Sequence, residues 1–188
     1  MALTAHEDCV VIVIDAQPGF HPRDLADADQ AAAAQALDRA AWLVALATRL
    51  EIPVVVTEEE PEVNGPTDPR LAVAPAFVKP TFGLAGTPAI LEAVLQTGRT
   101  TAILVGFETD VCVYQSAVGL LDHLTAVIVV EDATFSPGEM HARGLARLRD
   151  AGARLTHTKA LAYEWARTVE RSTSLLSSGV LGPAPFRL

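Results

Sequence analysis

The sequence is poor in aromatic residues and in positive charge, and each shortage narrows what the protein can be. Only two tryptophans, two tyrosines and six phenylalanines occur in 188 residues, half of which are hydrophobic. We therefore expect an aliphatic core like that of an open α/β sheet. The 14 basic residues are outnumbered by 23 acidic ones, which gives a formal net charge of −9. Because binding to a phosphate backbone needs a basic face, nucleic acid is not an expected partner.

Cysteines and long apolar runs are equally scarce. Cys9 and Cys112 form neither a disulfide framework nor a CxxC zinc pattern, and Cys9 is expected to be inert. No apolar run approaches the roughly 20 residues that a membrane helix needs. Glu7 and Asp8 stand where a signal peptide would carry positive charge, and the apolar run after them is too short for one. We expect a soluble, cytoplasmic protein without a membrane partner.

Short apolar runs alternate with helical patterns along the chain. Glycines that suit helix C-caps, Gly98 and Gly152, precede two of the runs. Alternation of this kind predicts a single-domain α/β fold, a doubly wound Rossmann-like three-layer sandwich with a mainly parallel sheet. The expected strands are residues 10–14, 53–57, 101–105, 126–130 and 153–156.

The expected domain covers residues 1–171, and residues 172–188 form a C-terminal tail. This tail is rich in Ser, Gly and Pro, which predicts either a loose end or an arm that packs on a neighbouring subunit. Residues 58–75 predict a long surface loop, and residues 77–83, which contain Lys79, predict an irregular stretch.

The most informative segment is residues 106–113, Gly-Phe-Glu-Thr-Asp-Val-Cys-Val, at a predicted strand-to-helix junction. If Thr109 caps the helix, Cys112 becomes its third residue. There the free N–H groups and the helix dipole favour a thiolate, so Cys112 is a candidate nucleophile. The alternative is a structural cysteine, because free cysteine is often buried.

Ligands of open α/β sheets bind beyond the carboxyl ends of the strands, where Asp15, Lys79 and Cys112 can converge. Asp15 can accept the thiol proton of Cys112, and Lys79 can hold Asp15 ionised. The backbone N–H groups of Glu108 and Cys112 can form an oxyanion hole. Each residue also has an ordinary explanation: Asp15 as a turn residue, Lys79 as a solvated lysine. Asp132 is expected to be a turn residue or the cap of the next element.

Other candidates are weaker. Glu58 lines the pocket or belongs to a solvated loop, and Phe20 and Phe82 form a pocket wall or pack in the core. His123 lies about 16 Å along the helix from Cys112, too far to pair with it. His21 is expected at the surface. His141 and His157 show no partner pattern.

Taken together, these residues resemble the isochorismatase-like cysteine hydrolases. The matching motifs are Asp15-Ala-Gln17-Pro-Gly-Phe20, the segment around Lys79 and the cysteine motif, in the family's order, over about residues 10–165. The resemblance implies a catalytic triad of Asp15, Lys79 and Cys112. It also implies a cis peptide between Phe107 and Glu108, which would aim the Glu108 N–H at an oxyanion, and a substrate pocket lined by Gln17, Phe20, Glu58, Phe82 and Tyr114.

Departures from the family pattern select among its branches. The Asp-x-His metal motif of nicotinamidases is replaced by Thr57-Glu-Glu-Glu-Pro61, so we expect no metal and no cofactor. This loop resembles the isochorismatase-domain branch instead. Members that cleave the vinyl ether of isochorismate tend to lack the cysteine, so its presence favours C–N chemistry.

The leading hypothesis is a metal-independent hydrolase that cleaves an amide-type C–N bond of a small molecule through a Cys112 thioester. The alternatives are an isochorismatase-type ether hydrolase, a catalytically idle oligomeric binding protein, and a redox sensor. The family generally forms dimers or larger oligomers, so a homo-oligomer is expected.

Overall fold

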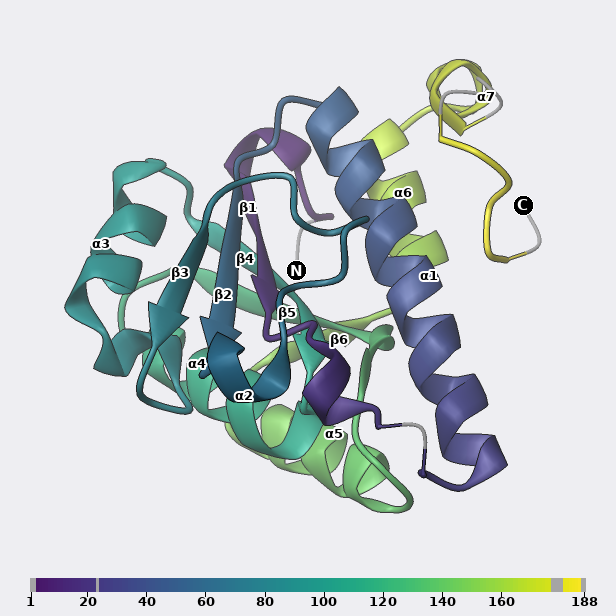
Figure 1. Ribbon diagram of the computed structural model, residues 1–188. Helices are drawn as coiled ribbons and strands as arrows, with labels where there is room; N and C mark the ends of the chain where they lie inside the picture. The colour runs from purple at the N-terminus through teal and green to yellow at the C-terminus, as the bar shows by residue number, and fades with distance from the viewer. Residues whose placement is uncertain (1–2, 23, 177–180, 187–188) are drawn as a thin grey trace.

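The computed structural model describes residues 3–22, 24–176 and 181–186 (Figure 1). Six strands and seven α-helices occur in that part of the chain. The strands are β1 Cys9–Ile14, β2 Val54–Glu59, β3 Ala76–Lys79, β4 Thr101–Phe107, β5 Ala126–Phe135 and β6 Arg154–Thr156. The helices are α1 Asp27–Arg49, α2 Pro61–Asn64, α3 Pro88–Gln96, α4 Tyr114–Leu121, α5 Met140–Asp150, α6 Thr158–Ala166 and α7 Val169–Leu176.

The strands form one parallel sheet in the order β3-β2-β1-β4-β5-β6. This is the doubly wound order, and it confirms the predicted fold. β1 and β4 lie side by side at the centre, and every residue of both is buried, as their apolar sequences require. The strand order reverses between them, so a crevice opens beyond their carboxyl ends.

Each face of the sheet has its own core. α1 and α6 cover one face, and α3, α4 and α5 cover the other (Figure 1). Trp165, which is fully buried, packs in the first core, and Ile90 and Leu148 pack in the second. Alternating side chains of β1 divide between them: Val11 and Val13 face α1, whereas Val10 and Ile12 face α3 to α5. Because helices cover both faces of the sheet, we expect the active site at the carboxyl ends of the strands.

Several strand predictions were too short, and one strand was missed; β4, for example, continues two residues beyond its expected end at Val105. β2 continues two residues beyond Thr57, and β5 continues to Phe135 after a register shift opposite residues 104–106 of β4. Residues 76–79, of which 77–79 were expected to be irregular, form the edge strand β3. Phe77 and Val78 are exposed on this edge, so the segment lacks the buried apolar run that marks a central strand.

The C-terminal segment packs against its own chain. α7 crosses the predicted boundary at residue 171, and Phe186 contacts the Trp42 ring of α1 edge-on, with 4.9 Å between centroids. Residues 177–180 and 187–188 of the predicted tail lie outside the described part. An arm that joins subunits stays a prediction. No helix of the described residues is long and apolar enough to cross a membrane.

Candidate active site

Asp15 begins the site, directly after β1. Its backbone has a φ of 45°, which turns the chain out of the strand, and its N–H donates to the Thr57 carbonyl of neighbouring β2. One carboxylate oxygen accepts the Thr57 hydroxyl at 2.8 Å, and the other lies 2.6 Å from Nζ of Lys79. The carboxylate is thus fixed between two strands.

Lys79 reaches Asp15 from the end of β3. It pairs with Glu59 in the sheet register, and its Nζ also donates to the Thr81 carbonyl at 3.0 Å. The side chains of Lys79 and Asp15 are both fully buried. Burial raises the pKa of Asp15, while the Lys79 ammonium and the Thr57 hydrogen bond act against that rise.

Cys112 lies on a single turn of π-helix, Thr109–Val113, that leads into α4. The turn closes through the Val113 N–H, which donates to the Glu108 carbonyl at 3.0 Å. The prediction that Thr109 caps this helix is wrong: no side-chain cap is formed, and its hydroxyl is 2.9 Å from Nδ1 of His141 on α5. Tertiary contact with α5 thus takes the hydroxyl that local sequence assigned to the cap.

The Cys112 thiol is 2% exposed and faces two carboxylates. Its Sγ donates to Oε2 of Glu59 at 3.3 Å, and Asp15, Glu59 and Cys112 have polar atoms within 4.8 Å of one another. Burial, followed by the charge of Asp15, raises the pKa of Cys112, and Lys79 opposes this. The expected thiolate-favouring environment is therefore not what the structure provides, because burial and the carboxylates favour the thiol.

Glu59, rather than Glu58, points at the nucleophile. Alternate residues of a strand share a face, so Glu59 lies on the same side as Thr57. Glu58 turns the other way and accepts both the N–H and the hydroxyl of Thr67 at 2.7 Å. The alternation of side chains along a strand could have identified Glu59 from the sequence. It was missed because β2 was expected to end at Thr57.

The connection from β4 to the π-helix is tight. The Phe107–Glu108 peptide bond is cis. Gly106 has a φ of +113°, and a Cβ there would overlap the Ile14 carbonyl of β1. Glycine is required at this point because the backbones of β1 and β4 approach too closely for a side chain.

The remaining predicted pocket residues divide into two groups. Gln17 is buried, and its side-chain amide binds the backbone of Glu59 and Gly65, while Phe20 packs against the α1-side core. Phe82 and Tyr114 line a separate hollow of about 620 Å³, whose lining does not include Cys112. Phe82 is half exposed there. The structure therefore brings Asp15, Lys79 and Cys112 together, but not all five pocket candidates.

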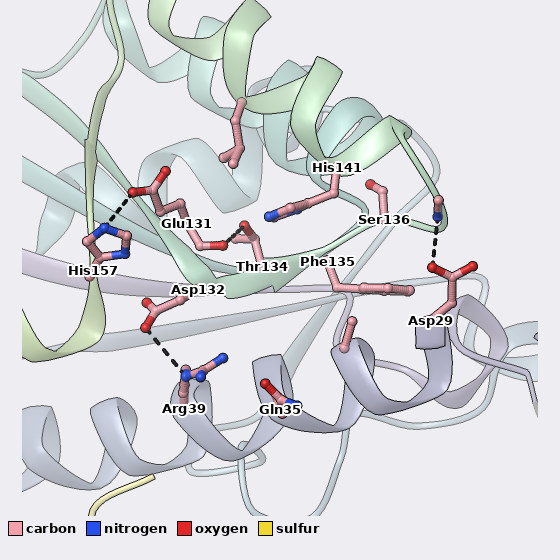
Figure 2. A pocket seen from close by; sticks show the side chains of 13 residues that line it. Asp29, Gln35, Arg39, Glu131, Asp132, Thr134, Phe135, Ser136, His141 and His157 are labelled. Atoms are coloured by element: carbon pink, nitrogen blue, oxygen red, sulfur yellow. Dashed lines mark hydrogen bonds and ion pairs between the residues drawn. The ribbon is translucent and has the colours of Figure 1, made fainter. Parts of the chain in front are cut away.

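A second cavity, of about 400 Å³, lies between α1, the end of β5 and α5 (Figure 2). Figure 2 shows two ion pairs on its wall, Glu131 with His157 at 2.9 Å and Asp132 with Arg39 at 3.4 Å. The His141 ring points into it from α5. Burial lowers the pKa of His141. This histidine showed no sequence pattern because its partner, Thr109, lies 32 positions away.

The structure also shows where Asp132 and His21 lie. Asp132 is neither a turn residue nor the cap of the next element, because it lies within β5; its carboxylate accepts both the N–H and the hydroxyl of Thr158 at the start of α6, beyond α5 and β6 in the sequence. His21, expected at the surface, is half-buried and stacks edge-on against Phe107, with 5.5 Å between centroids.

Asp15, Glu59 and Cys112 also have the spacing of metal ligands. Two hard oxygen donors and one thiolate suit a borderline ion such as Zn²⁺. The Lys79 ammonium, however, lies 2.6 Å from Asp15 and 3.9 Å from Glu59. It supplies positive charge to these two carboxylates, and a metal ion among the same atoms would be repelled by it.

A parallel, doubly wound sheet with a buried cysteine, carboxylate and lysine at its central crevice is typical of a hydrolase built on an open α/β sheet. The chain belongs to the isochorismatase domain family, whose model matches residues 9–160. Isochorismatase domain-containing protein 2 of Xenopus laevis is 36% identical over 121 residues, covering 62% of this chain and 58% of that protein. The Bos taurus protein of the same name is 32% identical over 134 residues, covering 69% and 65%. The matched segment thus spans less than two thirds of either relative.

Solved structures share the fold over nearly the whole chain. The YcaC gene product of Escherichia coli, an octameric hydrolase of unknown specificity, is 24% identical with a TM-score of 0.82, covering 94% of this chain and 88% of that one. YcaC from Pseudomonas aeruginosa, with hexane-2,5-diol and covalent acrylamide, is 25% identical with a TM-score of 0.80, covering 97% and 93%. The MAR1 ribonuclease of Caenorhabditis elegans is 25% identical with a TM-score of 0.79, covering all of both chains.

Proposed function

We propose that the protein is a metal-independent cysteine hydrolase that cleaves an amide-type C–N bond of a small molecule. One observation carries the proposal: a buried Asp15 is held by Lys79 at 2.6 Å, and its carboxylate lies within 4.8 Å of the Cys112 sulfur. A base, its electrostatic partner and a nucleophile are thereby assembled in one crevice.

In the first half-reaction, Asp15 takes the Cys112 proton as Sγ bonds to the carbonyl carbon. The raised pKa values of both groups suit this role, because the thiol keeps its proton until a substrate arrives and Asp15 is a stronger base than an exposed carboxylate. The proton then passes to the leaving nitrogen, the C–N bond breaks, and ammonia or an amine departs from a thioester.

In the second half-reaction, Asp15 removes a proton from water, whose oxygen attacks the thioester carbon. The C–S bond breaks, a carboxylic acid leaves, and Cys112 regains its proton. The backbone N–H groups of Glu108 and Cys112 are assigned to the oxyanion in both steps, since Glu108 is the N-cap of the π-helix and Cys112 lies within that single turn. Lys79 stabilises Asp15 whenever it is ionised.

The solved relatives support a nucleophile at the site and an oligomeric state. Acrylamide is an electrophile, so its covalent attachment to the Pseudomonas aeruginosa protein points to a nucleophilic side chain in a protein of this fold, without cleavage of an amide. The E. coli neighbour is octameric, and Phe77, Val78 and Phe82 are exposed apolar side chains on this chain. We propose that the protein is cytoplasmic and forms a homo-oligomer. Residues 1–171 of each subunit form the hydrolase unit.

The catalytically idle binding protein remains a second candidate, and one observation favours it. Cys112 is only 2% exposed, so little of the thiol is open to a substrate. The cysteine hydrolase forms a thioester at Cys112 when it meets its substrate, whereas the idle binding protein forms none.

The test is ammonia release from a panel of small amides, with and without a chelator. We expect turnover that a chelator leaves unchanged and that Cys112→Ser and Asp15→Asn reduce by at least about 100-fold, in the range typical of a lost general base. Light scattering would report the oligomer. Full activity in folded Cys112→Ser would refute the thioester. Failure to release ammonia from any amide would instead favour the ether hydrolase or the idle binding protein. RNA is added as a further substrate, because one solved neighbour is described as a ribonuclease.

A further inference from the structure

The Glu59 carboxylate is the group nearest the nucleophile that the proposed reaction leaves without a task. Its Oε2 is 3.3 Å from Sγ of Cys112, and its side chain is 17% exposed, so it borders the space from which a substrate must approach.

The position of Glu59 is fixed by its backbone. The Gln17 side chain accepts the Glu59 N–H at 2.8 Å and donates to the Glu59 carbonyl at 3.1 Å. The Asn64 amide donates to the same carbonyl at 2.9 Å. This clamp at the end of β2 keeps the carboxylate beside the thiol.

The charge of Glu59 is poorly balanced. Lys79 lies 3.9 Å from Glu59 but 2.6 Å from Asp15, so its ammonium interacts more strongly with Asp15. Glu108, half-buried on the adjoining loop, shares these negative surroundings, since burial and the charges of Asp110 and Glu59 raise its pKa. Asp15 and Glu59 share the single ammonium of Lys79, and Glu108 adds a third carboxyl group nearby, so the site has more acidic than basic groups.

We infer that Glu59 is a specificity-determining residue and that the substrate is a small amide with a positively charged nitrogen close to its carbonyl. This inference rests on the proposed amide hydrolysis. Because Oε2 is 3.3 Å from Sγ, a carbonyl carbon that bonds to Sγ lies beside this carboxylate, within reach of a group on the adjoining carbon. A carboxylate only accepts hydrogen bonds, and once the substrate excludes water it needs donors, best supplied by an ammonium or a guanidinium.

The test compares alkylation of Cys112 by 2-bromoethylamine, which is cationic, with alkylation by iodoacetamide, which is neutral. The ratio of the two rates cancels any change in the thiol pKa, and Cys112→Ala corrects for Cys9. We expect Glu59→Gln to lower the ratio by about fivefold or more, the effect of one unit charge at about 4 Å in a water-like medium. Glu60→Gln is the matched control, because Glu60 is the exposed neighbour with the same charge.

An unchanged ratio in Glu59→Gln, an equal fall in Glu60→Gln, or a Cys112 that neither reagent modifies would overturn the inference. Hydrolysis is then measured on glycinamide and on propionamide, its uncharged analogue of similar shape. Preference for propionamide would also overturn it. A fall in the alkylation ratio without hydrolysis of any amide would refute the proposed function while leaving the charge selection by Glu59 in place.

Discussion

The buried ion pair between Lys79 and Asp15 gives the sharpest test of the site. Replacing Lys79 by Met keeps an unbranched side chain of similar length but removes the ammonium. At 2.6 Å and an effective dielectric constant of about 20, the lost attraction is about 6 kcal/mol. Losing Lys79 also removes its own desolvation cost, so we expect Lys79→Met to lower the free energy of unfolding by about 3–5 kcal/mol at pH 8.

The penalty should shrink in acid. Burial already raises the pKa of Asp15, and without Lys79 that pKa rises further. A raised carboxyl pKa means that the folded protein binds the proton more tightly than the unfolded chain does. The destabilisation is therefore small below the ordinary aspartate pKa of about 4 and grows as pH rises through the folded-state value. Urea denaturation at pH 5 and pH 8 measures the difference.

A double variant separates charge from packing. Asp15→Asn combined with Lys79→Met removes both charges, so it should be more stable at pH 8 than Lys79→Met alone by at least about 1–2 kcal/mol. A loss below about 1 kcal/mol in Lys79→Met, or a double variant no more stable than the single one, would refute the account of a buried, mutually compensating pair.

Further predictions concern the backbone, a buried histidine and the C-terminal segment. Gly106→Ala should cost about 2–3 kcal/mol in urea denaturation, because the new Cβ meets β1 at a positive φ, and a neutral result would contradict the close approach of the strands. His141→Asn should reduce the fall in the free energy of unfolding between pH 7 and pH 5. Burial lowers the pKa of His141 in the folded state, so the stability that the neutral ring contributes is present above about pH 6.5 and is lost as pH falls through the folded-state pKa. An unchanged pH dependence in the variant would contradict this. Phe186→Ala should cost about 1–3 kcal/mol by losing the Trp42 contact, seen as a lower urea midpoint, unless that segment contributes nothing to the fold.

Much of the fold was predictable because buried parallel strands have continuous apolar sequences. Residues 10–14 and 101–105 are such runs, and both are central strands in the structure. Edge strand β3 escaped prediction because half-exposed Phe77 and Val78 follow no burial period. The extension of β5 escaped because a register shift in the sheet, which local sequence does not encode, carries it on to Phe135.

The sequence by itself places Asp15 and Cys112 directly after two apolar strands and predicts a doubly wound sheet, in which the carboxyl ends of those strands lie together. How the two residues behave depends on contacts between distant segments. Strand pairing with β2 brings Lys79 within reach, the extension of β2 turns Glu59 rather than Glu58 toward the thiol, and packing of α5 engages Thr109 with His141. Burial and neighbouring carboxylates also keep Cys112 a thiol, and they oppose the local preference of a helix start for a thiolate.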